Sequence, residues 1–242
     1  MRYLLEIAFK GTRYHGWQIQ HNALSVQEVV NEKLSILLGE NIETLGCGRT
    51  DTGVHATSYF VHFDVAKKLD EEKHIFKLNQ ILPDDIAAYQ LKEVHTEFNA
   101  RFDATSRTYE YHITHQPNPF ITDTAWYQYG SLDLAAMNEA AKLLIGKKDF
   151  ECFSKVHTQV NNFICDVTEA YWKQENEKVI FTITANRFLR NMVRAIVGTL
   201  VEVGRGKLQP EDMQRILDSK DRSSAGQSVP AHGLFLTKII YP

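Results

Sequence analysis

The segment 46–56, which reads GCGRTDTGVHA, carries the side chain best suited to covalent chemistry. Its carboxylate, Asp51, stands in a predicted turn between glycines, just before a strand predicted over 59–65. A carboxylate with so little steric cover can face a cleft and act as a nucleophile or a base, and Arg49 would keep it ionised. The alternative is a structural Asp that hydrogen-bonds its own backbone, which is the usual role of Asp beside Gly.

Three arginines, Arg187, Arg190 and Arg194, form the second candidate group. They are spaced three and four residues apart, and the apolar pattern predicts a helix over about 188–203, so they would share one helix face. Such a ridge would contact RNA phosphates. A solvated basic face explains the spacing equally well, so both interpretations stay open.

The third group combines basic and aromatic side chains. Arg107, Tyr109 and Tyr111 alternate in a strand predicted over 106–115 and would therefore lie on one face. Basic groups interleaved with aromatic rings suit a nucleic-acid backbone and an unstacked base. The alternative, favoured for Tyr111, is a strand face with half-buried rings. Trp17, in a predicted loop over 13–20, likewise either meets a partner or anchors that loop in the core.

These candidates must be held by elements that the apolar pattern also predicts. Ser25 and Glu28 form a capping box, in which each side chain satisfies a free N–H group at the start of a helix that ends at Gly39. The element order predicts an α+β fold of two similar lobes, 1–105 and 106–242, packed as one body. Further helices are expected over 71–81, 133–145 and after Pro210, and strands over 2–9, 86–94, 125–130, 167–172, 179–185 and 234–241.

The expected lobes each carry a mixed, mainly antiparallel sheet with helices on one face. We expect the two sheets to join into one extended sheet, with a cleft between the lobes. The net charge of −3 over 242 residues argues against a protein that coats nucleic acid by bulk charge. Any RNA site must therefore be a local basic patch.

Several other classes are disfavoured by motifs that the chain lacks. The three cysteines form no CxxC pair and no signal peptide is evident, which indicates reduced thiols in the cytoplasm. No apolar run reaches the roughly 20 residues of a membrane span. The spacings typical of a zinc site, a P-loop or a dinucleotide-binding loop are missing, so we expect no metal and no nucleotide cofactor.

Together these stretches resemble one family, the TruA-type tRNA pseudouridine synthases. The similarity covers nearly the whole chain, and its most specific part is the segment 48–56, GRTDTGVHA. The departures are mild: Ser25 stands where Thr is usual, and Ser228-Val229 stands for Thr-Ala. The other matching parts are Gly16-Trp17-Gln18 with Gln20, Val26-Gln27, Ala100-Arg101-Phe102, Arg107-Thr108-Tyr109, Asp149-Phe150 with Phe153, Phe188-Leu189, Met192-Val193-Arg194, Val197-Gly198, Val203-Gly204 and Pro230-Ala231-His232-Gly233-Leu234.

The resemblance implies the pseudouridine synthase fold with a central RNA-binding cleft. It also implies an activity: isomerisation of uridine to pseudouridine at positions 38, 39 and/or 40, in the anticodon stem-loop of tRNA. The enzyme would be a cytoplasmic homodimer that needs no cofactor. Two alternatives remain, a non-catalytic RNA-binding protein on the same scaffold and a pseudouridine synthase that acts on another RNA.

The same resemblance assigns roles to individual residues. Asp51 corresponds to the nucleophile and Arg194 to the basic partner that pairs with it. Tyr109 corresponds to the ring that stacks on the target base and takes part in proton transfer, and Leu234 to an apolar wall of the uracil pocket. Arg49 then becomes a contact to the tRNA rather than the main partner of the carboxylate. The remaining expected substrate contacts are Arg107, Arg187 and Arg190.

Overall fold

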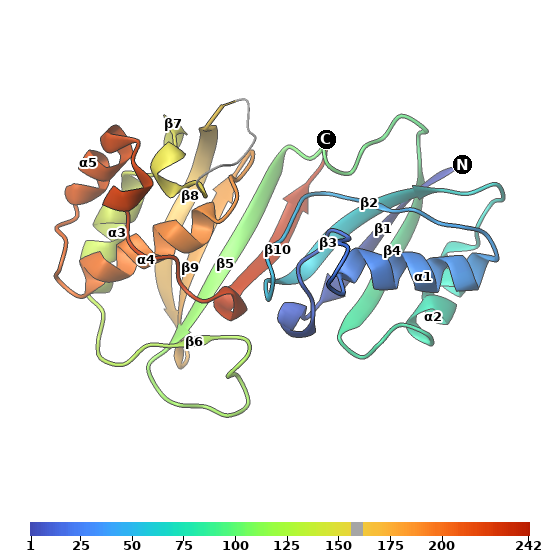
Figure 1. Ribbon diagram of the computed structural model, residues 1–242, viewed down its shortest axis with the longest axis horizontal. Coiled ribbons are helices and arrows are strands. Elements are labelled where there is room, and N and C mark those ends of the chain that lie inside the picture. The colour runs from blue at the N-terminus through green and yellow to red at the C-terminus, as the bar shows by residue number, and fades with distance from the viewer. Residues whose placement is uncertain (156–161) are drawn as a thin grey trace. The chain divides into compact units, whose positions relative to one another are not determined.

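The structure is a computed structural model that describes residues 1–155 and 162–242 of the chain. These residues divide into two compact units: unit 1 is Met1–Thr105 with Phe235–Pro242, and unit 2 is Ser106–Leu234. Each unit contains a mainly antiparallel sheet and helices (Figure 1). The predicted α+β class is therefore confirmed. That the two lobes pack as one body stays a prediction.

The sheet of unit 1 has four main strands in the order β4 (Ile86–Val94), β1 (Arg2–Phe9), β3 (His55–Asp64) and β10 (Leu234–Ile240). The short strand β2 (Leu45–Gly46) pairs with β3. The pairs are antiparallel except that β10 runs parallel to β3. Residues of β1 alternate between buried and half-exposed, as the two-residue period of a strand requires when one face packs on the core.

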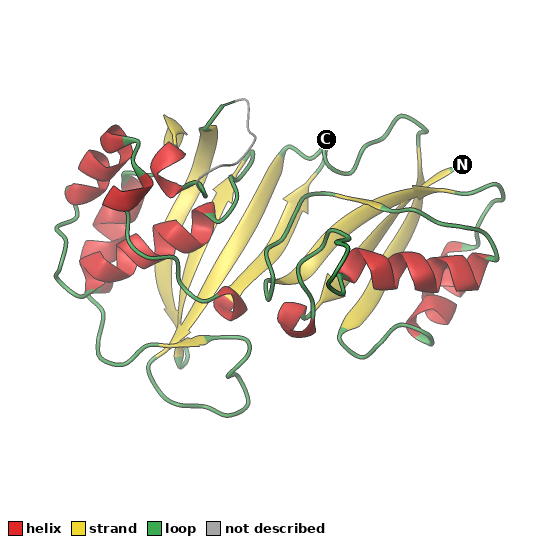
Figure 2. Ribbon diagram, viewed as in Figure 1, coloured by secondary structure: helices red, strands yellow, loops and turns green. Residues whose placement is uncertain are grey.

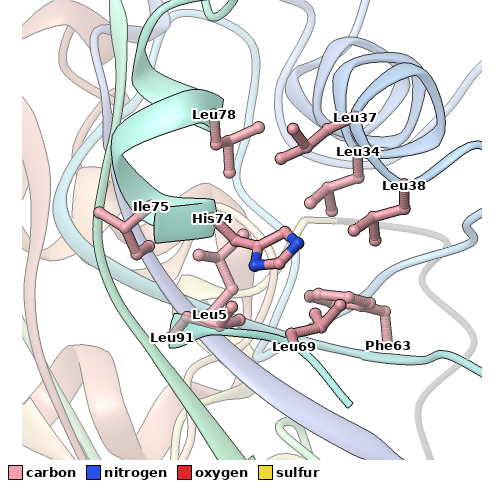
Figure 3. Close-up of a pocket in the computed structure, with 10 residues that line it drawn as sticks. All are labelled: Leu5, Leu34, Leu37, Leu38, Phe63, Leu69, His74, Ile75, Leu78 and Leu91. Carbon is pink, nitrogen blue, oxygen red and sulfur yellow. The ribbon is translucent and has the colours of Figure 1, made fainter. Parts of the chain in front are cut away.

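Helices α1 (Val26–Leu38) and α2 (Glu71–Asn79) pack on the sheet of unit 1. Helix α1 begins as predicted, because Ser25 Oγ accepts a hydrogen bond from the Glu28 N–H at 3.2 Å. It ends at Gly39, whose φ of 71° is left-handed and suits glycine. An apolar cavity of about 10 Å³ lies between the two helices and the sheet (Figure 3). It is lined by Leu5, Leu34, Leu37, Leu38, Phe63, Leu69, His74, Ile75, Leu78 and Leu91.

The sheet of unit 2 is antiparallel along the order β5 (Ser106–Thr114), β9 (Lys178–Ala185), β8 (Ile164–Glu175) and β7 (Gly146–Asp149). A two-residue strand, β6 (Trp126–Tyr127), runs parallel to β5. The helices of unit 2 gather on one side of its strands (Figure 2). They are α3 (Leu134–Lys142), α4 (Met192–Gly204) and α5 (Asp212–Ser219), with single turns η2 (Glu151–Phe153), η3 (Arg222–Ser224) and η4 (Ala231–Gly233).

The largest differences between the predicted and the observed elements concern β6, α4 and β10. The strand expected over 125–130 is reduced to β6, and the helix expected over 188–203 begins only at Met192, after Asn191 with its left-handed φ of 65°. The C-terminal strand, predicted to belong to the second lobe, lies largely in unit 1 because it pairs with β3. Helix α4 is also not amphipathic: within it, only Arg194 and Glu202 escape full burial.

Candidate active site

Asp51 lies in a tight turn at the entrance to β3. The Val54 N–H donates to the Asp51 carbonyl at 3.1 Å, and Gly53 adopts a φ of 78° that glycine tolerates without strain. The Asp51 residue is half-exposed and Arg49, two positions earlier, is exposed. The backbone of the turn is thus fixed, and the residue that carries the carboxylate keeps part of its surface exposed.

A loop that follows β1 braces this turn. The Gly53 N–H donates to the Tyr14 carbonyl at 3.2 Å, and the Gly11 N–H donates to His55 Nδ1 at 3.0 Å. Gly16 has a φ of 83°, and a Cβ added to it would lie 2.2 Å from the Thr50 carbonyl oxygen. A Cβ at Gly11 would meet the next part of the turn, the Val54 carbonyl oxygen, at 2.0 Å. Both glycines therefore allow a close backbone approach that no other residue type permits.

The brace is itself held by Asp85. Arg13 Nε donates to Asp85 Oδ2 at 2.6 Å, and the Tyr14 hydroxyl donates to Asp85 Oδ1 at 2.7 Å. Burial raises the pKa of the Asp85 carboxyl, but the hydrogen bonds from Arg13 and Tyr14 outweigh it and hold that pKa below its usual range. Burial and the bond to Asp85 raise the pKa of Tyr14. The carboxylate is therefore ionised at neutral pH and clamps two consecutive residues of the brace.

Aromatic side chains pack beneath the turn. The Trp17 ring lies 4.5 Å from the Tyr59 ring and is 3% exposed, so the interpretation of Trp17 as a buried loop anchor is confirmed. The Tyr59 hydroxyl donates to the Gly48 carbonyl. A Cβ at Gly46 would lie 2.3 Å from the Tyr59 hydroxyl oxygen, whereas one at Gly48 would meet nothing within 4 Å. Internal packing thus explains Gly46, and Gly48 has open space on its surface.

Tyr109 lies on β5, opposite Ile183 of β9. Its half-buried ring meets Phe188 edge to face, with 5.1 Å between centroids and an interplanar angle of 87°. Arg107, on the same strand face, donates from Nη1 to the Asn186 carbonyl at 2.8 Å. The packing against Phe188 fixes the plane of the Tyr109 ring within unit 2.

Arg194 occupies the first turn of α4 and is half-buried. Its Nε donates to the Val229 carbonyl at 2.8 Å, and the Val229 N–H donates to the Arg194 carbonyl at 3.2 Å. Because a guanidinium group is planar, the bond at Nε sets the plane in which both terminal nitrogens lie. The segment around Val229 therefore orients the arginine.

The predicted ridge of arginines on one helix face is wrong. Arg187 and Arg190 precede α4, so helical spacing does not align them with Arg194. Arg187 Nη1 donates to Asn162 Oδ1 at 3.5 Å, and the exposed Arg190 accepts a bond at its carbonyl from the Lys155 N–H. The left-handed Asn191 separates them from the helix, a break that the continuous apolar pattern concealed.

Leu234 is 5% exposed and follows the single turn η4. Just before it, a Cβ at Gly233 would lie 2.7 Å from the Tyr111 ring, so the turn can reach the ring only with glycine there. The Tyr111 hydroxyl donates to the Pro230 carbonyl at 2.8 Å. Tyr111 is completely buried, and burial raises its pKa despite the opposing charge of Arg194. The interpretation of Tyr111 as a structural residue is thus confirmed.

The structure places the expected residues in two groups and adds others. Asp51 and Arg49 belong to unit 1, while the other expected site residues belong to unit 2, where Tyr111 and the segment 229–234 link Arg194 to Leu234. Gly11 and Asp85 belong to none of the motifs that predicted site residues. Glycine in a polar loop signals close approach. No local signal reveals Asp85, whose partners lie 72 and 71 residues away.

Within residues 1–155 and 162–242, no group of three or more His, Cys, Asp or Glu side chains is arranged to hold a metal ion. Over the same residues, every helix is too short or too polar to cross a bilayer. The three cysteines described, Cys47, Cys152 and Cys165, are buried free thiols.

Comparison with known proteins identifies the family. The profile of a family described as tRNA pseudouridine synthase matches residues 140–242. A protein of Bacteroides thetaiotaomicron named tRNA pseudouridine synthase A is 49% identical over 100% of this chain and 91% of its own length. Proteins with the same name from Bacteroides fragilis and Clostridium acetobutylicum are 48% and 42% identical, over 100% and 98% of this chain and 96% and 98% of their own lengths. The chain therefore belongs to the tRNA pseudouridine synthase A family, a family of isomerases.

Proposed function

We propose that this enzyme converts uridine to pseudouridine at positions 38–40 in the anticodon stem-loop of tRNA, with Asp51 as the nucleophile. Membership of the family supports the reaction and the substrate class. The observation that supports Asp51 is the construction of its turn: two close glycine contacts and a hydrogen bond to Tyr14 brace a residue that remains half-exposed.

The reaction needs one well-placed carboxylate. The bond between C1′ and N1 of the uridine breaks, the uracil turns, and a bond between C1′ and C5 forms. The proton on C5 is lost and N1 gains a proton, so the reaction is an isomerisation. Asp51 acts either by adding to C1′ as N1 leaves or by removing a sugar proton to give a glycal. In both routes water must stay out of the site while the base is detached.

Tyr109 is proposed to receive the flipped uracil. Taking a base out of its stack costs a few kcal/mol, and stacking on an aromatic ring returns roughly 1–3 kcal/mol of that. The perpendicular contact with Phe188 supports this role because it holds the Tyr109 ring in one plane before the base arrives. The hydroxyl of Tyr109 is a candidate for the proton transfer at C5 or N1.

Arg194 and Leu234 are proposed to complete the site. The bond from Arg194 Nε to the Val229 carbonyl supports Arg194 as the partner of Asp51, since a preoriented guanidinium loses little freedom on binding a carboxylate. Leu234, close to full burial and positioned by Gly233, supports an apolar wall beside the uracil ring. Both assignments depend on the family resemblance and on the local geometry of unit 2.

Four further arginines are proposed as tRNA contacts: Arg49, Arg107, Arg187 and Arg190. Arg49 and Arg190 are exposed and the other two are half-exposed, which suits contact with phosphates. Such contacts make binding sensitive to salt, because each neutralised phosphate releases counterions. Arg205 and Lys207 are less suited to this role, since both are paired with Glu202 at 2.7 and 2.8 Å.

The enzyme is further proposed to be a cytoplasmic homodimer without a cofactor. The buried free thiols support a reducing compartment. The exposed rings of Phe120 and Tyr129, 91% and 84% exposed, offer apolar surface that association can cover. Light scattering of the purified protein measures the dimer mass, and dialysis against a chelator should leave the activity unchanged.

Release of tritium from tRNA labelled at C5 of uridine tests the proposed activity. The wild-type protein should release tritium, Asp51→Asn should release none and should still bind tRNA, and Glu40→Gln should behave as wild type. Glu40 is a matched control because it is an exposed carboxylate of the same unit. Binding of tRNA by the wild type with no tritium release would show a non-catalytic RNA-binding protein. Mapping of pseudouridine in RNA from a deletion strain identifies the positions and the RNA class.

A further inference from the structure

The loop over 98–105 presents two large side chains to solvent. It lies at the end of the segment Met1–Thr105 of unit 1. Phe102 is 74% exposed and Arg101 is exposed beside it. Exposing a phenyl ring to water is unfavourable. Such a ring is therefore a candidate for contact with a binding partner. The interior of the same loop is fully buried, as Ala100 shows with no exposed surface.

Ala100 anchors the loop to the core of unit 1. Its N–H donates to His62 Nδ1 at 3.1 Å, and its carbonyl accepts from the Tyr241 hydroxyl at 2.7 Å. At the two ends of the loop, Arg2 Nη1 donates to the Phe98 carbonyl at 2.8 Å, and Thr105 is tied to β10 through its N–H at 2.8 Å from the Ile240 carbonyl. The anchors come from β1, β3 and the C-terminal segment, so the position of the loop is set by the whole unit.

Two side chains of the loop itself satisfy its backbone. Asn99 Oδ1 accepts from the N–H groups of Arg101 and Phe102 at 3.0 and 3.2 Å. Asp103 Oδ2 accepts from the Asn99 N–H at 2.8 Å, and the Asp103 N–H donates to the Asn99 carbonyl at 3.0 Å. These bonds fix the backbone that carries Arg101 and Phe102. A ligand bound by these two side chains therefore causes little further loss of backbone entropy.

The two presented side chains form a unit. The guanidinium carbon of Arg101 lies 5.3 Å from the centroid of the Phe102 ring, within the range of a cation–π contact. A ring with a cation at its face offers a stacking surface and a phosphate contact together. By contrast, the exposed rings of Phe120 and Tyr129 lie in the segment 115–133, which contains no lysine or arginine.

We infer that the Arg101–Phe102 pair is a second RNA contact of this enzyme, in which Phe102 stacks on an unpaired base and Arg101 binds the adjoining phosphate. The inference depends on the proposed function for its ligand, an RNA with unpaired nucleotides such as the anticodon loop. Single-stranded nucleic acid is bound in this way, by rings that accept any base and by cations that follow the backbone. The role is positioning of the substrate, since neither side chain takes part in the proposed chemistry.

The test compares Phe102→Ala, Phe102→Leu, Phe102→Tyr and Arg101→Gln with wild type in binding of an anticodon stem-loop RNA. Phe102→Ala should weaken the affinity by about 5- to 150-fold, the factor that corresponds to the loss of one stacked base. Phe102→Leu keeps apolar area but loses the ring and should be equally weak, while Phe102→Tyr should bind like wild type. Phe76→Ala, which removes a ring 67% exposed on α2, is the matched control and should change nothing.

The salt dependence tests Arg101 separately. Arg101→Gln should reduce the slope of log affinity against log salt concentration by about 1, as expected for one lost phosphate contact. Tritium release at saturating RNA should stay at the wild-type rate in all four variants, because the defect is in binding. Circular dichroism confirms that each variant is folded. If Phe102→Ala lowers stability, the RNA affinities of the folded Phe102→Leu and Phe102→Tyr variants decide whether the ring binds RNA.

The outcomes separate this inference from the proposed function. Wild-type protein that binds the RNA but releases no tritium contradicts the proposed activity, while the binding series still tests Phe102. Wild-type activity together with unchanged RNA affinity in Phe102→Ala overturns the inference and leaves the activity intact. Unchanged RNA affinity with a shift from dimer to monomer in light scattering also overturns it, because Phe102 then contacts a second copy of the chain.

Discussion

The Gly53 N–H donates to the carbonyl of Tyr14 across 3.2 Å, which ties the turn of Asp51 to the loop after β1. The carboxylate of Asp85 holds the same tyrosine by its hydroxyl at 2.7 Å. A chain of contacts therefore runs from Asp85 through Tyr14 and Gly53 to the proposed nucleophile. Three segments of unit 1 that are distant in sequence therefore set the position of the turn that carries Asp51.

Gly16→Ala should damage both the fold and the activity, whereas Gly48→Ala should leave the fold intact. A Cβ at Gly16 would collide with the Thr50 carbonyl oxygen at 2.2 Å, in a backbone conformation that costs other residues about 1–3 kcal/mol. A Cβ at Gly48 would meet nothing within 4 Å. Urea unfolding compares the two variants with wild type. Equal stability of Gly16→Ala and Gly48→Ala would contradict the brace. A weaker tRNA affinity of the stable Gly48→Ala variant would show that RNA approaches there.

Asp85→Asn should lower the rate of pseudouridine formation while leaving tRNA affinity near wild type. The variant loses the charge that Arg13 and Tyr14 bind, and we expect the free energy of unfolding to fall by about 1–3 kcal/mol at pH 7. Since the pKa of Asp85 is lowered in the folded protein, its contribution is present above the unfolded value of about 3.9 and is lost as the pH falls through the folded pKa.

Urea unfolding from pH 7 to pH 3 follows that contribution, with the exposed neighbour changed in Asp84→Asn as the control. The difference in stability between wild type and Asp85→Asn should shrink toward the acid end. A difference that is constant across this range would show that ionisation of Asp85 is not what holds the brace.

Tyr109→Phe should retain tRNA binding, because the ring and its edge-to-face contact with Phe188 are preserved. A fall in the single-turnover rate at saturating tRNA would then report the hydroxyl in proton transfer. Tyr109→Ala removes the ring and should cost roughly 1–3 kcal/mol in binding. Loss of affinity in Tyr109→Phe comparable to that in Tyr109→Ala would argue against stacking as the role of this residue.

Arg194→Lys should lose most of the activity although the positive charge is kept. An ammonium group cannot bond the Val229 carbonyl through a planar Nε and at the same time present two fixed donors to a carboxylate. Pairing with Asp51 is tested by a double-mutant cycle on the single-turnover rate with Asp51→Glu. Additive effects of Arg194→Lys and Asp51→Glu would show that the two side chains act independently.

Acid should destabilise the loop of Arg101 and Phe102 through His62. Burial and the charge of Arg2 lower the pKa of His62, against the opposing effects of Asp64 and Asp103. As the pH falls below about 6.5, the unfolded chain takes up this proton before the folded protein does, so the free energy of unfolding decreases. His62→Asn keeps an acceptor for the Ala100 N–H but does not titrate.

Unfolding of wild type and His62→Asn between pH 8 and pH 5 measures the difference. The free energy of unfolding of the variant should depend less on pH than that of wild type. Above about pH 6.5 the two plots of this free energy against pH should have the same slope. Parallel curves throughout the range would show that His62 does not contribute to the acid sensitivity.

Local patterns in the sequence predicted several secondary-structure elements of this protein and the family to which it belongs. The N-cap at Ser25 and the glycine at position 39 delimit α1 as predicted, because both interactions involve residues within one helical turn. The alternating, β-rich pattern over 2–9 predicted the strand β1, whose residues do alternate between buried and half-exposed. The ordered motifs around Asp51, Tyr109 and Arg194 were specific enough to indicate the family, which the comparisons confirm.

Contacts between distant residues decided the rest. The left-handed Asn191 delays the start of α4 to Met192, so Arg187 and Arg190 are not aligned with Arg194. The last strand lies largely in unit 1 because it pairs with β3, about 180 residues earlier, and a single strand carries no signal of its partner. Gly11, Gly16 and Asp85 acquire their roles only when the loop after β1 meets the turn of Asp51. The sequence thus points to Asp51 as the proposed nucleophile, and the packing of unit 1 decided what holds its turn in place.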